Sequence, residues 1–461
     1  MIEEIKETRF ENGLVVLTDR MSHVRSVTLG FFYRTGARNE PREMSGITHF
    51  IEHTVFKGTA RRSALDIAIE QDRLGGNLEA FTTHEETGFA IKVIDDELEA
   101  AFDLLSDMLV NPMFDQKELE SEQRVIIEEM KMMDDSPEEF LGEMFNREFF
   151  PEDALGRPIP GTPQTVVQFG HDITCKYHRE NFTPENLVIV AAGNVEHERV
   201  VEMTTPISWT PPSGVAGKDV RVPRTAAPII VHQRPDLEQA HLVIGLPFVD
   251  AKSEKRYAAD LLTNIIGGGT SSRLWQKIRE DRGLAYNVGS SDVMYETIGV
   301  FTIFAATSPK QVNEVVDIAI DEMRNVVANG IGEHELELAK HQARSSVLLN
   351  LEDSAARAAA LAQSEMVFGR QITVEETLAR VDAVTLEDIT KLSREFFATE
   401  DVAFATIGDL DGLIIDRGKL KIGSQISAIR YRIFYTRLFK SAQPQGARIA
   451  RTARKFFIAI A

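Results

Sequence analysis

Apolar residues along the chain follow two spacings, which predict strands and helices in turn. Short runs of β-branched and apolar residues beside turn-forming residues predict β-strands. These runs cover residues 11–20, 24–36, 78–94 and 186–195. Apolar residues three or four positions apart predict amphipathic helices. Helices of this kind are expected at residues 63–76, 97–112 and 115–135. The first 200 or so residues therefore predict an α+β domain.

The same order of elements occurs a second time after residue 228. The second set comprises a strand at 241–249, a helix at 255–266, a Gly-rich loop, two strands and helices at 311–329 and 332–350. An offset of 217 residues places Glu118 on Glu335 and aligns the two long helices. This repeat indicates an ancient duplication. We therefore predict an α+β fold of two homologous domains with about 200 residues each.

A proline-rich stretch separates the two repeats. Residues 204–228 contain five prolines and little apolar periodicity, which is typical of a linker. We predict a first domain at 1–205, a linker at 206–228, a second domain at 229–416 and a tail at 417–461. The tail carries eleven basic residues and no acidic one. Three interpretations of it stay open: a disordered basic extension, a segment foreign to the gene, or an amphipathic stretch that contacts an anionic membrane or the acidic body.

The sequence HFIEH at residues 49–53 holds the strongest candidate chemistry. His49 and His53 are four positions apart, so on a helix they share one face. Glu52 is close enough to reach the point that both imidazoles face. Two neutral imidazoles and a carboxylate suit a zinc ion with a general base beside its bound water. The simpler alternative is a surface histidine pair with a salt-bridging glutamate. The second repeat lacks the motif, so only the first half carries this chemistry.

The spacing of residues leaves the third zinc ligand open. A catalytic zinc usually takes three protein ligands. The candidates are His84, Glu85 and Glu86 in one segment and Glu122 and Glu129 on the predicted helix at 115–135. Glu122 and Glu129 are seven positions apart and share one helix face, which favours them without excluding His84. The alternative for both acids is a solvated helix face.

Composition and charge restrict the class of protein. A chain of 461 residues is longer than one hydrophobic core usually fills. The formal net charge of −20 argues against a general nucleic-acid binder. The single cysteine, Cys175, excludes an intrachain disulfide. The N-terminal segment is acidic without an apolar core, and no stretch approaches the ~20 apolar residues of a membrane span. These features predict a soluble cytoplasmic protein.

Seven segments resemble, in order, those of a known enzyme family. Residues 46–59, GITHFIEHTVFKGT, are similar to the inverted zinc motif of the pitrilysin/insulinase metallopeptidases, the inverzincins. The other segments are RTGARNE, EQRVIIEEMKMMDDSP, LGRPIPGT, FTPENLVIVAAGNV, GGGTSSRLWQKIREDRGLAY and ATIGDL. The resemblance covers nearly all of residues 1–416. It is strongest to the short two-domain members, which include bacterial peptidases and the catalytic subunit of the mitochondrial processing peptidase.

The resemblance implies a role for each candidate in the first domain. It makes His49, His53 and Glu129 the ligands of one Zn²⁺ per chain and Glu52 the general base. It makes Glu122 a supporting carboxylate and His84 a loop residue. It also implies a clamshell, in which two mixed β-sheets covered by helices face each other.

The resemblance further implies how substrate is held. Arg279 and Tyr286 correspond to an Arg–Tyr pair that moves over the site and grips the substrate. A peptide is expected to add to the edge of the strand that contains Glu79 and Ala80. Glu79 stands where the family usually has asparagine, and a carboxylate cannot donate to a substrate carbonyl. Together with the formal charge of −31 on residues 1–416, Glu79 suggests a preference for basic peptides.

The sequence thus predicts a zinc-dependent endopeptidase that hydrolyses unfolded or extended peptides inside a closing chamber, with zinc-bound water as nucleophile. Because one chain holds both half-sites, we expect a monomer or homodimer. The alternative is a non-catalytic or processing-complex subunit that binds peptides. Family members of that kind typically lose the zinc motif, which this chain keeps.

Overall fold

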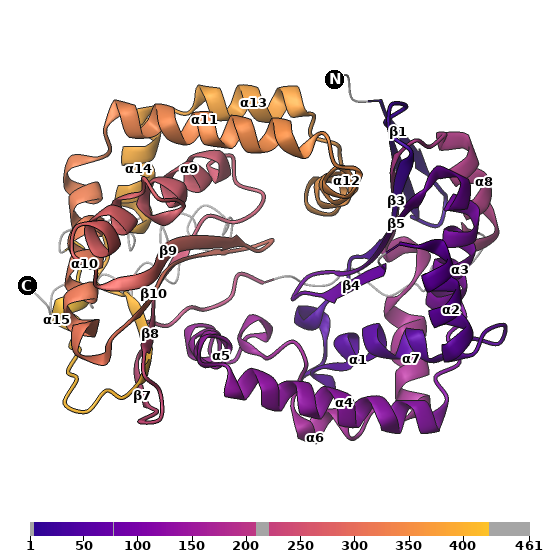
Figure 1. Cartoon of the computed structure of the whole chain (residues 1–461), viewed down its shortest axis with the longest axis horizontal. Helices are drawn as coiled ribbons and strands as arrows, with labels where there is room; N and C mark the ends of the chain where they lie inside the picture. Colours follow the sequence, from indigo (N-terminus) through magenta and orange to yellow (C-terminus); the bar gives the residue numbers. More distant parts are fainter. Residues whose placement is uncertain (1–3, 77, 209–220, 424–461) are drawn as a thin grey trace, which may run out of the picture.

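The two halves of the chain form two facing units, each built on a mixed β-sheet covered by helices (Figure 1). A computed structural model describes residues 4–76, 78–208 and 221–423. The predicted α+β fold of two homologous, facing domains is confirmed. The exact domain boundaries stay a prediction.

The first half contains a six-stranded sheet in the order β1-β2-β6-β3-β5-β4. Its strands are β1 (Ile5–Arg9), β2 (Val15–Arg20), β3 (Ser26–Tyr33), β4 (Leu78–Thr82), β5 (Thr87–Ile94) and β6 (Leu187–Gly193). Strands β2 and β6 run parallel, and the other neighbours run antiparallel. Strand β6 is apolar along its length and entirely buried, as a central strand covered on both faces must be.

Helices cover one face of this sheet and enclose the first core. The helices of the first half are α1 (Ile47–Thr54), α2 (Ala64–Leu74), α3 (Leu98–Val110), α4 (Gln116–Asp135), α5 (Pro137–Phe149), α6 (Pro163–Val166), α7 (His171–Asn181) and α8 (His197–Ser208). Strand β4 forms one edge of the sheet and lies against α1. The helix that carries the histidine motif is therefore placed beside an edge strand.

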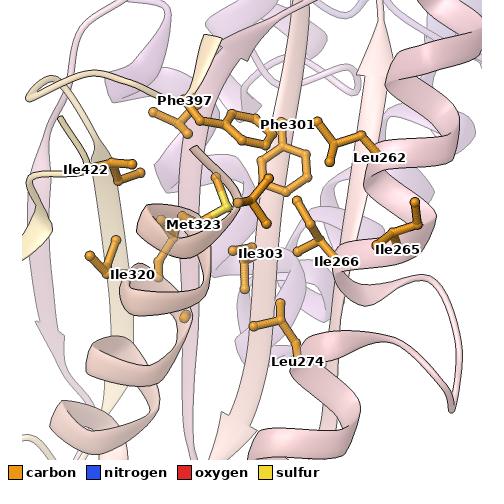
Figure 2. Packing of buried hydrophobic residues seen from close by; sticks show 14 of the residues in the cluster. Leu262, Ile265, Ile266, Leu274, Phe301, Ile303, Ile320, Met323, Phe397 and Ile422 are labelled. Atoms are coloured by element: carbon orange, nitrogen blue, oxygen red, sulfur yellow. The ribbon is translucent and has the colours of Figure 1, made fainter. Parts of the chain in front are cut away.

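The second half contains a five-stranded sheet in the order β7-β11-β8-β10-β9. Its strands are β7 (Ile229–Gln233), β8 (Ala240–Phe248), β9 (Ala285–Met294), β10 (Gly299–Thr307) and β11 (Ala403–Gly408). Its helices are α9 (Arg256–Gly267), α10 (Val312–Asn329), α11 (Glu333–Asn350), α12 (Ser354–Phe368), α13 (Val374–Ala383), α14 (Leu386–Phe396) and α15 (Arg417–Leu420). Figure 2 shows its core, where Phe301 and Phe397 pack beside Met323 and Leu262.

Each half gives one helix to the sheet of the other half. Helix α5 packs on β8 and β11 of the second sheet, and α12 packs on β2, β3 and β6 of the first (Figure 1). Both contacts are apolar: Phe145 and Phe149 of α5 are buried against the second sheet, and Leu361 of α12 against the first. Buried Glu365 of α12 also pairs with Arg9 and Arg34 of the first half. The two halves are thus joined by packing as well as by the linker.

Three details differ from the sequence prediction. The predicted strand at 78–94 is a hairpin, because the Thr83 hydroxyl accepts from the backbone N–H groups of Glu85 and Glu86 and turns the chain. Helix α8 continues through the predicted start of the linker to Ser208, and residues 209–220 lie outside the described part. The predicted tail begins at residue 417, but Leu420 and Ile422 are buried in the second core. The remaining tail, 424–461, lies outside the described residues.

Among the described residues, the structure contains no helix with the length and apolar character needed to cross a bilayer. The cytoplasmic location stays a prediction.

Candidate metal centre

The start of helix α1 is fixed by a buried carboxylate and two glycines. The Glu40 carboxylate accepts from the backbone N–H groups of Gly46 and Thr48, both at 2.8 Å, so it satisfies donors that a helix start leaves unpaired. Gly46 has a φ of +96°, and a Cβ on Gly161 would lie 2.2 Å from the Ser45 carbonyl oxygen. The predicted segment LGRPIPGT therefore packs directly behind the histidine helix.

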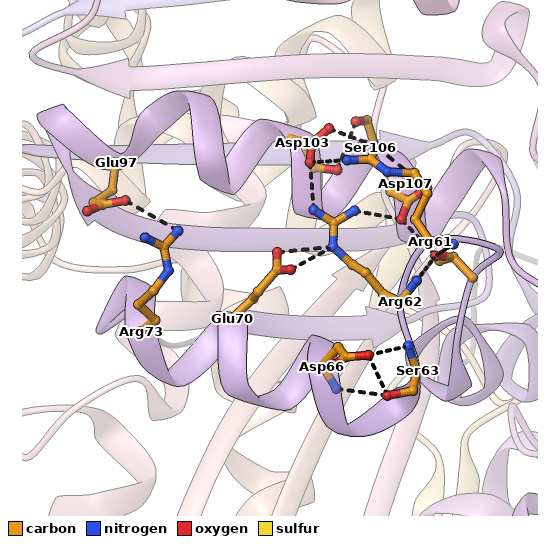
Figure 3. A network of polar contacts seen from close by, with 11 residues as sticks. Arg61, Arg62, Ser63, Asp66, Glu70, Arg73, Glu97, Asp103, Ser106 and Asp107 are labelled. Carbon is orange, nitrogen blue, oxygen red and sulfur yellow. Dashed lines mark hydrogen bonds and ion pairs between the residues drawn. The ribbon is translucent and has the colours of Figure 1, made fainter.

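The turn after α1 is held by a buried arginine (Figure 3). The Arg62 guanidinium lies 2.6 Å from Asp107 and from Asp103 of α3, and 3.0 Å from Glu70 of α2. Since the donors and acceptors match, the charge is satisfied within the fold. Both ends of the histidine segment are thus anchored, which favours a rigid site.

His49, His53 and Glu129 come together between α1 and α4. One ligand atom from each residue lies within 4.8 Å of the other two. His49 Nε2 is 3.9 Å from Glu129 Oε1, and His53 Nε2 is 3.7 Å from Glu129 Oε2. Three donors on one tetrahedral zinc, at bonds of about 2.0–2.2 Å, would be separated by roughly 3.3–3.6 Å. The group is therefore close to the spacing that zinc requires.

The surroundings shift the pKa values of the two imidazoles in opposite directions. Burial and the neighbouring His53 lower the pKa of His49 to about 3, so His49 is neutral at physiological pH. Burial alone would lower the pKa of His53, but Glu122, Glu52 and Glu129 raise it. Buried Glu129 Oε2 has no hydrogen-bond donor within the described chain. A cation between these atoms would satisfy the unpaired oxygen and the His53 nitrogen together, so the donor set fits zinc.

Glu122 lies behind His53 and is held in turn by Lys57. Glu122 Oε2 is 3.3 Å from His53 Nδ1, and its other oxygen is 2.7 Å from Lys57 Nζ. Burial alone would raise the pKa of Glu122, but contacts with His53 and Lys57 lower it. The anionic carboxylate can accept from His53 Nδ1 and leave Nε2 facing Glu129.

Glu52 points toward strand β4 and is almost fully buried. The Thr82 hydroxyl donates to Glu52 Oε2 at 2.6 Å. Burial raises the pKa of Glu52, while Thr82 and His53 lower it and Glu129 raises it further. A carboxylate in these surroundings is suited to take up and release a proton.

Lys57 and Thr82 were not predicted from the sequence, because each acts through a residue from another element. Lys57 follows His53 by four positions, and this spacing could have indicated that the two side chains lie on the same side. Thr82 follows Ala80 by two positions, so both side chains lie on one face of β4.

Arg279 and Tyr286 contact each other on the second half. The Arg279 guanidinium lies 4.5 Å from the Tyr286 ring centroid and 4.1 Å from that of Trp275. It also donates to the Tyr286 carbonyl at 2.8 Å. Tyr286 is 76% exposed. Within the described chain, neither residue makes a hydrogen bond or ion pair with the three candidate ligands.

The predicted peptide-binding residues lie on the edge strand β4. Glu79 is exposed and Ala80 is half-buried, and their strand pairs with β5 on one side. On the other side β4 has no strand neighbour among residues that the structure describes. This edge can accept an extended peptide.

The remaining candidate ligands lie apart from the two histidines. His84 Nε2 is 3.2 Å from the Arg157 carbonyl oxygen, and its ring packs edge-on to Tyr295. Glu85 pairs with Arg38. Glu86 is outside the group of possible metal ligands that contains both histidines, and burial raises its pKa.

The sequence matches two family models. Residues 15–163 match the model described as insulinase (peptidase family M16), and residues 171–343 match the model described as peptidase M16 inactive domain. A protein of Streptomyces coelicolor described as an uncharacterized zinc protease is 35% identical over 86% of this chain and 87% of its own length. A second, from Bacillus subtilis, is 34% identical over 87% of this chain and 98% of its own.

Solved structures share the fold. A protease from Helicobacter pylori has a TM-score of 0.80 and 20% identity over 88% of this chain and all of its own. A Pseudomonas fluorescens structure described as a peptidase M16 inactive domain has a TM-score of 0.82 and 17% identity over 88% of this chain and 98% of its own. With both halves matched and relatives above 30% identity along most of the sequence, the chain belongs to the insulinase family of peptidases, M16.

Proposed function

We propose that the protein is a zinc-dependent endopeptidase that hydrolyses unfolded or extended peptides. The observation that carries this proposal is the convergence of His49, His53 and Glu129 beside the buried carboxylate of Glu52. His49, His53 and Glu129 would hold the zinc ion. Relatives described as zinc proteases support this choice of metal.

Catalysis divides among the side chains around this centre. A bound zinc ion would polarise the scissile carbonyl and acidify water. Glu52 takes the proton from the attacking water and passes it to the leaving amine, and Thr82 holds the carboxylate in place. Tyr286, with Arg279 behind it, donates to the developing oxyanion or the adjacent substrate backbone once the halves approach.

Substrate specificity follows from the edge strand and from charge. An extended peptide pairs with the free side of β4, so a folded segment cannot bind there. Glu79 places an exposed carboxylate on that strand. With the acidic body of the protein, it favours peptides that carry basic residues.

The alternative is a peptide-binding subunit without catalysis. The family model for an inactive domain, which matches residues 171–343, keeps this alternative open. It predicts peptide binding with no turnover in the presence of zinc.

The test combines zinc content with cleavage of a quenched peptide. Glu52→Gln should keep one zinc ion per chain and lose turnover, because the amide cannot accept the proton. Glu129→Gln should lose zinc as well as turnover. Glu128→Gln is the matched control, since Glu128 is the exposed neighbour on the same helix, and it should keep both. A chelator should abolish cleavage, and added zinc should restore it. Undiminished cleavage by Glu52→Gln would exclude this mechanism, and a wild-type protein that binds zinc without cleaving would favour the alternative.

A further inference from the structure

A buried arginine and a glutamate connect the two halves at the end of the substrate strand. Arg38 of the first half is 9% exposed at its side chain and pairs with Glu85 in the β4–β5 turn. The same guanidinium donates to the Thr297 hydroxyl of the second half at 2.7 Å. Glu85 in turn accepts from the backbone N–H of Glu296 at 2.9 Å. We name these four residues the clasp.

The clasp is built into the backbone on both sides. The Arg38 N–H donates to the His84 carbonyl at 2.7 Å, which fixes the arginine to the β4–β5 turn. Glu296 and Thr297 form the turn between β9 and β10. A shift of the clasp therefore shifts two strands, β4 and β9, relative to each other.

Both strands connected by the clasp carry residues of the proposed active site. Thr82, which holds Glu52, lies three residues before Glu85. Tyr286 lies at the opposite end of β9 from the clasp, roughly 30 Å away at about 3.3 Å per residue. A rotation of about 5° at the clasp would move that end by roughly 2–3 Å, because the hairpin acts as a lever.

Aromatic packing accompanies the clasp, because the Tyr295 ring of the second half lies edge-on to His84 and Phe150 of the first. A cavity of about 950 Å³ lies next to it and is lined by both halves, including Arg38, Glu85 and Glu296. The clasp therefore adds directed polar contacts to an apolar interface that also joins the halves here.

We propose that Glu85 and Arg38 are positioning residues that align the β9–β10 hairpin, and with it Tyr286, against the substrate strand β4. This inference rests on the proposed peptidase function. Glu85 and Arg38 would act through the hairpin, without contacting the metal or the substrate themselves.

The first experiment measures the placement of the halves without any activity. In a Cys175→Ser background, spin labels at Glu128→Cys on α4 and Glu337→Cys on α11 report the distance between the halves. Both positions are exposed, and Figure 1 shows their helices on opposite sides of the molecule. Glu85→Ala should broaden or shift the distance distribution. Glu85→Gln, which keeps an acceptor for the Glu296 N–H, should have a smaller effect.

The second experiment measures peptide cleavage by the same variants. Glu85→Ala should bind zinc like the wild type and lower kcat/KM by roughly 10- to 100-fold, mainly through kcat. The kcat/KM of Glu85→Gln should lie between those of Glu85→Ala and the wild type. Glu180→Ala is the control, because Glu180 lines the same cavity and makes no hydrogen bond or ion pair with the second half within the described chain. It should match the wild type in both experiments.

An unchanged distance distribution for Glu85→Ala would overturn the inference, as would an equal change for Glu180→Ala. If the wild type proves inactive, the proposed function fails, and the distance measurement alone decides whether the clasp aligns the halves.

Discussion

Lys57 extends the polar chain behind the proposed zinc ligands by one residue. Its ammonium group lies 2.7 Å from Glu122, which contacts His53. Lys57→Met should keep most of the length of the side chain and lose the charge, so that Glu122 orients His53 less firmly. We expect zinc affinity to fall by roughly 10- to 100-fold, measured by competition with a chromogenic chelator.

Lys131→Met is the control for Lys57→Met. Lys131 pairs with exposed Glu128 on the outside of α4, and exposed pairs contribute little. Equal zinc affinity in the wild type and Lys57→Met would show that Glu122 needs no support.

Glu79 gives a test of substrate preference at the edge strand. Glu79→Asn replaces an acceptor-only carboxylate with a neutral amide that also donates. We expect the ratio of kcat/KM between a basic and an acidic peptide of equal length to fall severalfold, and the difference to shrink in high salt. If the ratio is the same in Glu79→Asn and the wild type, Glu79 does not determine any preference for basic peptides.

The residues of the candidate centre differ in how far the sequence could predict them. His49, Glu52 and His53 lie within one helical turn, so their spacing alone indicated a shared function. Glu129 comes from another helix, and only the family resemblance separated it from His84. Thr82 could not be predicted, because its contact with Glu52 depends on how β4 packs against α1.

At the scale of elements, the histidine helix depends on the segment behind it. Gly161 has a φ of +80°, and an added Cβ would meet the Ser45 carbonyl oxygen. Gly161→Ala should therefore move the start of α1 and lower the free energy of unfolding by at least about 1–2 kcal/mol, with weaker zinc binding.

Gly142→Ala is the opposite case in the same half. Gly142 lies inside α5 and an added Cβ would meet nothing within 4 Å. This change should raise the free energy of unfolding by about 0.5–1 kcal/mol. Denaturant unfolding measures both variants, and equal effects of the two substitutions would contradict the role given to Gly161.

The positions of most elements follow from periodicity, but their partners do not. An apolar face on a helix shows that it is buried, and the pattern contains no information on which sheet buries it. Helices α5 and α12 each follow a long helix of the repeat, yet each packs on the sheet of the other half. Likewise, Leu420 and Ile422 are the two buried apolar side chains among the described residues of the basic stretch, 417–423, and two are too few to produce a period.

At the scale of the whole molecule, we expect α12 to couple the unfolding of the two halves, because it packs on the first sheet. Leu361 of α12 is 3% exposed and packs on the first sheet, although its chain neighbours belong to the second half. Leu361→Ala should lower the free energy of unfolding by about 2–5 kcal/mol. We expect one calorimetric transition for the wild type and two for this variant.

Leu262→Ala provides the comparison for coupling. Leu262 is buried within the second core alone (Figure 2), so its loss should destabilise the protein while leaving a single transition. Two transitions in the wild type would mean that the exchanged helices do not couple the halves.

The exchange of α5 and α12 also bears on how the chain arose. A single ancestral copy, with its long helix pair but no second sheet to cover, would have left one helix and one sheet face bare. Two such copies could exchange that helix, so that each covers the exposed sheet face of the other. A symmetric dimer would then be the smallest assembly with both sheets covered. Joining the two genes end to end keeps the helix exchange within one polypeptide. One copy can then lose its histidines and still supply the helix that covers the sheet of the other copy.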